Sequence, residues 1–287
     1  MWIVLSLLTA LFYALGGAWT KKIMTRLDRY TVTWAMFAFA LPIVAAVVIF
    51  TGIPEIKPKF YWGGAGTLLL NMVAFTMFVK ALKLSPLSLT FPFLSFTPVF
   101  LIFTGFIFLG EMPTPRAMAG VVFTAAGAYV LNLGRIKEGF FAPVKAVVSE
   151  KGSLLMLGVS FIWSFAATFD KVALLGSDPF FFILAFNTGF TLLYLPFVLK
   201  VNPSFTKELK NRPGDLLVLG ALSGLMVIFQ MAALRGAYVS YVIAIKRSGV
   251  IFTLLLGRIF FEENIDSSRI TGTFMMAAGV FLIAFYS

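Results

Sequence analysis

Two adjacent cations, Lys246 and Arg247, lie near the middle of an apolar stretch that extends from residue 238 to residue 257. The stretch is long enough to cross the hydrocarbon core of a bilayer, which takes about 20 apolar residues in a helix. A Lys or Arg at the bilayer centre costs roughly 2.5–3.5 kcal/mol on insertion scales, so two of them need a protein interior, water or a counter-ion. No Asp or Glu falls in the middle of any long apolar stretch, and the counter-ion we expect is therefore a bound substrate. Arg suits bidentate recognition of phosphate or carboxylate and Lys supplies a point charge, so the pair indicates an anion site in a membrane carrier.

Other polar and aromatic side chains inside apolar stretches are candidates for the same site. The amides Asn71 and Gln230 either hydrogen-bond a ligand or join two helices, and the sequence leaves both alternatives open. Trp163 lies in mid-stretch, where a cavity position competes with a place in the aromatic belt of the membrane interface. Asp170 and Lys171 end the sixth stretch, either as a gating ion pair at the mouth of a cavity or as a solvated helix terminus. Asp170 would reach the cavity itself if this helix ended deeper than expected.

The amino acids that are missing narrow the chemistry. The 287 residues include neither Cys nor His, which removes disulfides, thiol catalysis, the usual zinc ligands and the usual general base. We therefore expect no enzyme, no catalytic residue, no metal site and no cofactor. The net charge of +11 would suggest nucleic acid in a soluble protein. Here the basic residues fall mostly in loops, without a nucleic-acid-binding module, so no nucleic-acid partner is expected.

The composition is that of a membrane protein. Hydrophobic residues make up 60% of the chain and charged residues 12%, against about 25% charged residues in an average soluble domain. We predict an all-α integral membrane protein with ten transmembrane helices. The predicted spans are 2–20, 30–51, 61–82, 86–109, 116–133, 152–170, 179–199, 215–235, 238–257 and 268–286.

The second part of the chain repeats the first. With an offset of 152 residues Glu111 falls on Glu263, and with an offset of 150 residues Tyr13 falls on Trp163. We expect each Glu to accept backbone N–H groups at the start of the next helix, with a coupling-ion role as the alternative.

This repeat divides the chain into two five-helix halves, 1–133 and 152–287, joined by an amphipathic, basic linker at 134–151. Because five is odd, the second half is inverted in the membrane relative to the first. Inverted repeats are typical of transporters, which bind their substrate in a central cavity near the midplane. Lys246 and Arg247 have no cationic counterparts in the first half, so the scaffold itself does not require them.

Two further features concern the membrane and assembly. Loops on one predicted face carry 14 Lys and Arg residues and loops on the other carry five, so we expect the basic face to be cytoplasmic and both termini to lie outside an inner (plasma) membrane. Membrane lipid is then a partner, in particular for the basic linker. Small residues on the fifth and tenth spans indicate close helix packing and, as a hypothesis, a homodimer through these spans. They are Gly120, Ala125, Ala126, Gly127, Gly272, Ala277, Ala278 and Gly279.

With its repeat and the acidic residues after spans 4 and 9, the chain resembles the EamA-type drug/metabolite transporter superfamily. The residues that carry the resemblance are Leu109-Gly110-Glu111, Phe261-Glu262-Glu263, Leu84-Ser85-Pro86-Leu87-Ser88 and Pro98-Val99-Phe100. The span-9 pair Lys246-Arg247 is also similar to that of the plastid triose-phosphate translocators, in which such a pair binds phosphate. Those translocators carry a further Lys where this chain has Leu94, so the three-cation phosphate site is incomplete here.

Together, the residues and the resemblance predict a transporter that moves a small metabolite with a phosphate or carboxylate group by alternating access. The absence of a mid-span carboxylate and of His favours exchange or facilitated movement over proton-driven export. The alternatives are an exporter of amino acids or other neutral or zwitterionic metabolites, in which Lys246 and Arg247 bind a carboxylate, and a flippase for a lipid phosphate.

Overall fold

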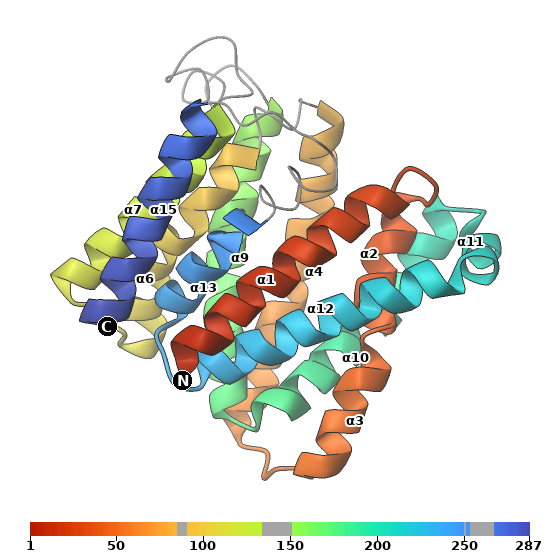
Figure 1. Ribbon diagram of the computed structural model, residues 1–287. Helices are drawn as coiled ribbons and strands as arrows, with labels where there is room; N and C mark the ends of the chain where they lie inside the picture. Colours follow the sequence, from red (N-terminus) through yellow and green to blue (C-terminus); the bar gives the residue numbers. More distant parts are fainter. Residues whose placement is uncertain (85–90, 134–150, 250, 253–266) are drawn as a thin grey trace.

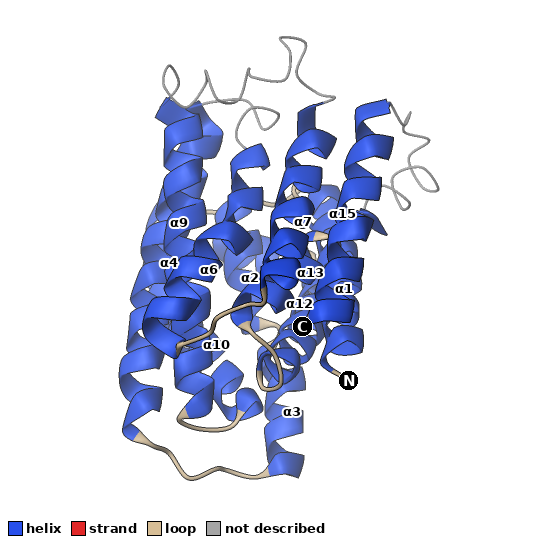
Figure 2. Ribbon diagram, turned by 90° about the vertical axis from the view of Figure 1, so that its left-hand side faces the viewer, coloured by secondary structure: helices blue, strands red, loops and turns tan. Residues whose placement is uncertain are grey.

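The computed structural model describes residues 1–84, 91–133, 151–249, 251–252 and 267–287. Regular structure in this part of the chain is helical, and Figure 2 shows a bundle of helices without strands among the described residues. The helices before residue 134 are α1 (Trp2–Ile23), α2 (Arg29–Ala38), α3 (Leu41–Thr51), α4 (Pro58–Leu84), the short 3-10 helix η1 (Phe91–Phe96), α6 (Thr97–Leu109) and α7 (Pro115–Leu133). Those after residue 150 are α9 (Lys151–Leu175), α10 (Pro179–Val201), α11 (Phe205–Asn211), α12 (Pro213–Leu234), α13 (Val239–Arg247) and α15 (Ser267–Tyr286).

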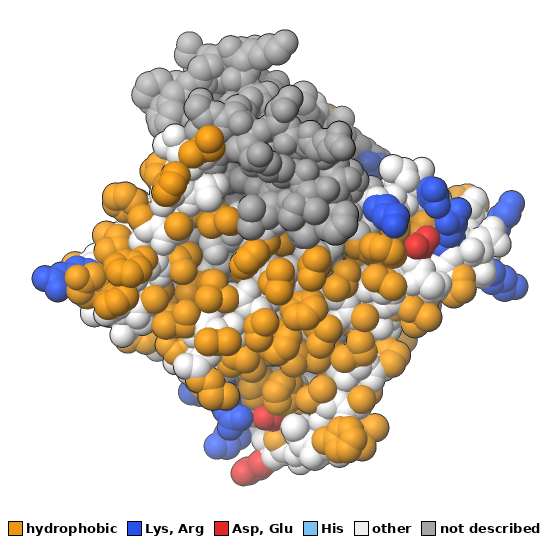
Figure 3. All heavy atoms as spheres, in the orientation of Figure 1, with side chains coloured by type: hydrophobic (Ala, Val, Ile, Leu, Met, Phe, Trp, Pro, Cys, Tyr) orange, Lys and Arg blue, Asp and Glu red, His pale blue; other side chains and the backbone are white. Residues whose placement is uncertain are grey.

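The helices are suited to a lipid environment. Five stretches within the described residues are long and apolar enough to cross a membrane: Trp2–Thr20, Arg29–Thr51, Lys151–Leu175, Pro179–Val201 and Pro213–Leu234. Large apolar side chains also remain exposed on the outside of the bundle, for example Phe50, Ile107 and Phe274. Figure 3 shows one such face as a broad apolar surface with most Lys and Arg side chains at its margins. An exposed apolar surface of this kind fits contact with lipid tails better than contact with water.

The major helix pairs join the two parts of the chain. α7 packs along α15, α4 along α9, and α1 along α12, while α10 contacts α2 and α3 (Figure 1). Glycines make the closest of these contacts possible. A Cβ atom on Gly120 would lie 2.8 Å from the carbonyl oxygen of Gly279, and one on Gly63 would lie 2.7 Å from the backbone nitrogen of Ala173. Small residues therefore let the backbones of α7 and α15, and of α4 and α9, approach directly.

The small residues of α7 and α15 thus pack these two helices against each other within one chain. Gly127, about two helical turns after Gly120, makes the same kind of contact. A Cβ atom added there would lie 2.7 Å from the carbonyl oxygen of Gly272. The expected close packing of the fifth and tenth spans is therefore found inside the chain. The homodimer through these spans stays a prediction.

The predicted spans coincide closely with helices where the chain is described, with three informative differences. The second span is two helices, because the chain makes a turn at Phe39–Ala40 just before Pro42, which has no N–H to donate. In the described part of the fourth span, the 3-10 helix η1 precedes α6. The sixth span, α9, continues five residues beyond the predicted end at residue 170. The linker predicted at 134–151 lies outside the described residues except for Lys151, as does Glu263.

Candidate functional site

Lys246 lies in the last turn of α13, where it points to α1 and α12. Its Nζ atom donates a hydrogen bond of 2.6 Å to Oε1 of Gln230, which is 93% buried, and lies 5.3 Å from the centre of the Tyr13 ring. The amide and the ring face supply partial negative charge, but neither carries a full charge. Lys246 is therefore held in place by neutral groups.

Arg247, the next residue, reaches α6 and α9, because neighbouring residues of an α-helix project about 100° apart. Its Nη2 atom donates to Oγ1 of Thr97 at 3.3 Å, and its guanidinium carbon lies 5.9 Å from the centre of the Trp163 ring. Nη1 donates to the Tyr13 hydroxyl at 3.4 Å. The Nε atom is buried and has no hydrogen-bond partner among the described residues. The guanidinium thus has a buried N–H donor without an acceptor among the described residues, and an oxygen atom of a ligand would supply one.

The groups around Arg247 are fixed by their own neighbours. The Thr97 hydroxyl donates to the carbonyl of Leu94 at 2.8 Å, and its oxygen lies 3.0 Å from that of Ser160, which is fully buried. Trp163 packs against the rings of Phe75 and Phe78, at centroid distances of 5.9 Å and 5.7 Å. Lys246, Arg247 and the four side chains that contact them, Tyr13, Thr97, Trp163 and Gln230, are called the cation site below.

A carboxylate lies closer to the cation site than the sequence suggested. Because α9 continues to Leu175, Asp170 is inside the helix, five residues before its end, and this carboxylate lies deeper in the span than the sequence indicated. Its Oδ1 atom accepts a hydrogen bond of 2.6 Å from Thr67, and it lies two helical turns after Trp163 on the same face of α9. No described carboxylate makes a direct ion pair with either cation of the site.

Asn71 belongs to the surroundings of Asp170 and makes no hydrogen bond to the cations. Its Nδ2 atom donates to the hydroxyl of Thr67 at 3.1 Å and to the carbonyl of the same residue at 3.0 Å. Thr67 has no exposed surface and links α4 to α9 through Asp170. Of the predicted site residues, the structure therefore brings Gln230 into contact with Lys246 and Trp163 into contact with Arg247. Asn71 is linked only to Asp170, through Thr67.

Lys171 does not pair with Asp170. It forms an ion pair and hydrogen bond with Glu111 and also donates to the carbonyl of Ala237. The two neighbours on α9 point apart, toward different partners, because successive helical side chains cannot share a face. The proposed ion pair of Asp170 with Lys171 is therefore replaced by an ion pair between the two halves of the chain.

Glu111 is placed by the turn that ends α6. Gly110 adopts φ 68°, a left-handed conformation that favours glycine, and the N–H of Glu111 donates to the carbonyl of Gly105 at 3.1 Å. The turn directs the carboxylate back into the bundle, where Oε2 accepts a 2.7 Å hydrogen bond from the backbone N–H of Val239. Glu111 therefore does accept an N–H group at a helix start, as expected, but at α13 in the other half rather than at the next helix. We call Glu111, Lys171, Ala237 and Val239 the clamp.

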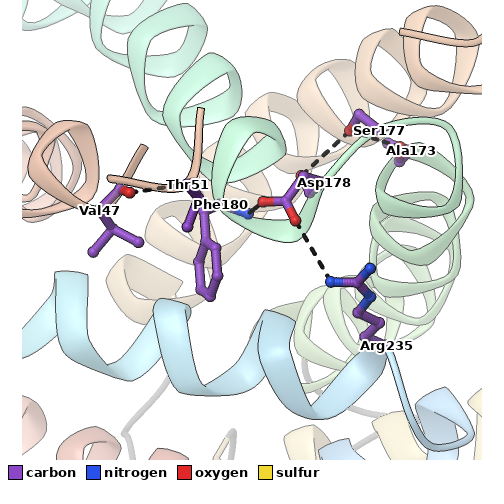
Figure 4. Close-up of polar contacts among 7 residues, drawn as sticks. All are labelled: Val47, Thr51, Ala173, Ser177, Asp178, Phe180 and Arg235. Carbon is purple, nitrogen blue, oxygen red and sulfur yellow. Dashed lines mark hydrogen bonds and ion pairs between the residues drawn. The ribbon is translucent and has the colours of Figure 1, made fainter. Parts of the chain in front are cut away.

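A second ion pair lies at the same end of the bundle. Asp178 caps α10 by accepting from the N–H of Phe180 at 2.8 Å, and its other oxygen lies 3.6 Å from Nη1 of Arg235 at the end of α12 (Figure 4). The Arg235 side chain is 70% exposed, so water competes for this pair. In the same view Ser177 donates to the carbonyl of Ala173 at 3.3 Å, which closes the turn between α9 and α10.

The sequence reasoning missed several participants. Tyr13 carried a signal, because it aligns with Trp163 in the repeat, and each ring indeed faces one of the two cations. Thr67 lies four residues before Asn71, on the same helix face, but hydroxyls are too common in such helices to single out. Within the described residues, no group of three or more acidic side chains could hold a metal ion.

Comparisons with known proteins bear on this geometry. Residues 1–133 and 150–285 match a protein family described as the EamA-like transporter family. A search of curated proteins found no match. A crystal structure of a protein 15% identical in sequence superposes with a TM-score of 0.76, covering 100% of this chain and 99% of the other. At this identity the likeness shows a shared fold.

Proposed function

The chain belongs to the EamA-like transporter family, and from this premise we propose that it moves a small metabolite with a phosphate or carboxylate group across the membrane. Movement is by alternating access of a site between the two halves, as exchange or facilitated movement. Lys246 and Arg247 hold the anionic group, with Gln230 and Trp163 as supporting contacts. The membrane is a plasma membrane, with both termini outside.

The observation that carries the proposal is the state of the two cations. Both are partly buried, both are held by neutral groups, and Nε of Arg247 lacks a partner among the described residues. Neither cation forms a direct ion pair with a described carboxylate. A buried cation in that state is costly, so a protein whose scaffold does not need the cation is expected to use it for a ligand. Phosphate and carboxylate oxygens match the planar donors of a guanidinium.

Alternating access is supported by how the helices pair. If α1 corresponds to α9 and α4 to α12, as the repeat predicts, the contact of α1 with α12 is the counterpart of the contact of α9 with α4, and both are extensive. The pairs α7 with α15 and α6 with α13 then map onto themselves. Such a pattern is expected from inverted repeats around a pseudo-twofold axis, where rocking of one half against the other exposes the site to each side in turn.

One observation favours an amino acid or other zwitterion as the alternative substrate. Asp170 lies on the same face of α9 as Trp163, the ring that contacts Arg247, and its charge acts on Lys246. A zwitterion would place its carboxylate at Arg247 and its ammonium near Asp170. The two candidates share the carboxylate or phosphate contact and differ in whether Asp170 contacts substrate.

The test is a thermal-unfolding screen of purified protein against inorganic phosphate, phosphorylated metabolites, nucleotides, polyprenyl phosphates, amino acids and organic cations. Each is measured with the wild type, Lys246→Gln and Arg247→Gln. Arg235→Gln is the matched control, because it removes a cation outside the cation site. We expect one anionic class to stabilise the wild type and Arg235→Gln but neither site variant.

Stabilisation by polyprenyl phosphates alone would identify a lipid phosphate, and stabilisation by amino acids alone would favour the zwitterion. Stabilisation only by cations or uncharged compounds, undiminished in both site variants, would contradict the proposal and make the pair structural.

A further inference from the structure

We propose that Asp170 is the resident counter-ion of the cation site and that it lets the carrier reorient without substrate. The protein then catalyses net movement and is not restricted to exchange. This inference rests on the proposed transport function and deepens it, because it chooses between the two modes of movement left open above.

The carboxylate of Asp170 has a fixed position inside the bundle. Asp170 lies five residues before the end of α9, is partly buried, and is held by the hydroxyl of Thr67 at 2.6 Å. Thr67 is held in turn by Asn71 from the same helix. A short chain of hydrogen bonds from α4 therefore fixes a carboxylate inside the bundle, where charge is expensive unless it has a purpose or a partner.

Glu111, the other carboxylate of this region, already has partners for both of its oxygens. Glu111 accepts from Lys171 through one oxygen and from Val239 through the other, and its side chain is 93% buried. Asp170 lies on the face of α9 that also carries Trp163, the ring against Arg247, and within the described part of the chain it is the acidic group whose charge acts on Lys246. Arg247 is the second cation beside Lys246, so the group contains two positive charges and one negative charge.

Asp170 and Lys246 do not form a direct ion pair with each other. Lys246 donates to Gln230 and Asp170 accepts from Thr67, so each charge is held by a neutral side chain on its own side. A substrate anion can then occupy the cations without displacing a tight salt bridge. When the substrate leaves, the carboxylate still offsets one of the two positive charges.

The consequence concerns the empty carrier. A site with two uncompensated cations would resist passage through a closed, dry state, since charge without a counter-ion is unfavourable in a low dielectric. Such a carrier would move only when loaded, which restricts it to exchange. With Asp170 present, the empty group carries the charge of one cation, and the return step without substrate becomes accessible.

The absence of Cys allows a direct measurement of reorientation. Ser240 lies in the first turn of α13, next to the clamp residue Val239, and is 2% exposed. In a Ser240→Cys protein in lipid nanodiscs, a hydrophilic maleimide reacts only when the clamp end opens. Gly236→Cys, at an exposed position of the preceding turn, gives the rate for an unhindered thiol.

We expect Asp170→Asn to slow labelling of Ser240→Cys by about tenfold, because two cations are then unbalanced. Asp170→Glu keeps the charge and should label near the wild-type rate. The double variant Asp170→Asn with Lys246→Gln restores the wild-type balance, one positive charge, and should also recover the rate. A structural role of Asp170 would not be rescued by removing Lys246. If Asp170→Asn does not fold, the double variant and Asp170→Glu carry the test.

Labelling of Asp170→Asn at the wild-type rate, or failure of the double variant to recover, would overturn the inference. Inorganic phosphate separates it from the anion-binding proposal. Acceleration of Asp170→Asn by phosphate supports both, since phosphate then replaces the missing carboxylate. Rescue by Lys246→Gln without any effect of phosphate, phosphorylated metabolites or amino acids would keep the counter-ion and count against the anion site.

Discussion

The clamp and the cation site both contain buried positive charge, but they treat it differently. In the clamp, Lys171 meets the carboxylate of Glu111 and a backbone carbonyl, and the second oxygen of Glu111 meets the N–H of Val239. In the cation site, Lys246 and Arg247 meet an amide, hydroxyls and ring faces. The clamp pairs its cation directly with a carboxylate, whereas the cation site has no direct ion pair among the described residues.

The difference teaches how to separate structural from functional charge in one membrane protein. A complete ion pair between α9 and the loop after α6 holds two halves together and needs nothing further. Buried donors that lack acceptors make the protein less stable than it could be. A ligand that supplies these acceptors gains binding free energy from them. Substitutions should therefore lower stability in the clamp and lower affinity in the cation site.

The largest effect is expected for Lys171→Gln. It leaves the Glu111 carboxylate buried without its cation, which typically costs about 3–5 kcal/mol of unfolding free energy. The measurement is chemical unfolding of purified protein, and the double variant with Glu111→Gln should recover a large part of the loss. Equal stability of Lys171→Gln and wild type would place Lys171 in the same category as the cation site.

Arg247→Gln should show the opposite pattern. Without ligand we expect its unfolding free energy to stay within about 1 kcal/mol of wild type, because Nε has no partner in the part of the chain that the structure describes and the other hydrogen bonds of the guanidinium are long. Its Kd for the anionic ligand should rise about 10–100-fold, corresponding to the roughly 1.5–3 kcal/mol of a charge-assisted hydrogen bond. Isothermal titration measures this, and a large stability loss with unchanged Kd would erase the contrast with the clamp.

Thr97→Val sharpens the comparison at an intermediate magnitude. It removes the hydroxyl that contacts both Arg247 and Ser160, which should cost about 1 kcal/mol in stability and a few-fold in anion affinity. Thr104→Val is the matched control, since Thr104 bonds to Thr168 across the same pair of helices, with no hydrogen bond to either cation among those described. It should lose similar stability and retain full affinity. Equal affinity losses in both variants would point to a general loosening of α6.

The smallest effect is expected for Arg235→Gln. Its partner Asp178 is 3.6 Å away and the Arg235 side chain is mostly exposed, so the pair should contribute about 0.2–1 kcal/mol. Unfolding in low and high salt measures it, because an exposed pair is screened. A loss as large as that of Lys171→Gln would show that this ion pair, and not the clamp alone, secures this end of the bundle.

Much of the fold could be predicted because hydrophobic length is a strong signal in membrane proteins. The ends of the helices of residues 1–133 and of α10, α12 and α15 lie within a few residues of the predicted spans. The end of α9 was placed too early, because Asp170 and Lys171 look like a polar terminus in sequence. Their different partners fit the continuation of the helix. Asp170 accepts a hydrogen bond from Thr67 and Lys171 forms an ion pair with Glu111, so each has a polar partner inside the bundle and neither has to reach water.

The candidate site was predicted in part for a similar reason. Lys246 and Arg247 stand out because charge is rare in apolar helices, and Gln230 and Trp163 are found in contact with them. Which carboxylate serves which cation depends on packing between segments far apart in the chain. Glu111 and Lys171 are separated by 60 residues, and no local pattern could have joined them.

The interruption between α2 and α3 has a consequence for how the protein deforms. Pro42 has no N–H to donate to the carbonyl of Ala38, so one backbone hydrogen bond of this span is missing just where the chain turns. Gly224 of α12 packs against this turn. A Cβ atom added to Gly224 would lie 3.4 Å from the Cβ atom of Ala40. A helical span bends most easily where a backbone hydrogen bond is missing. Bending of the bundle would therefore concentrate at this joint, and the helices that carry the charges could tilt as stiff bodies.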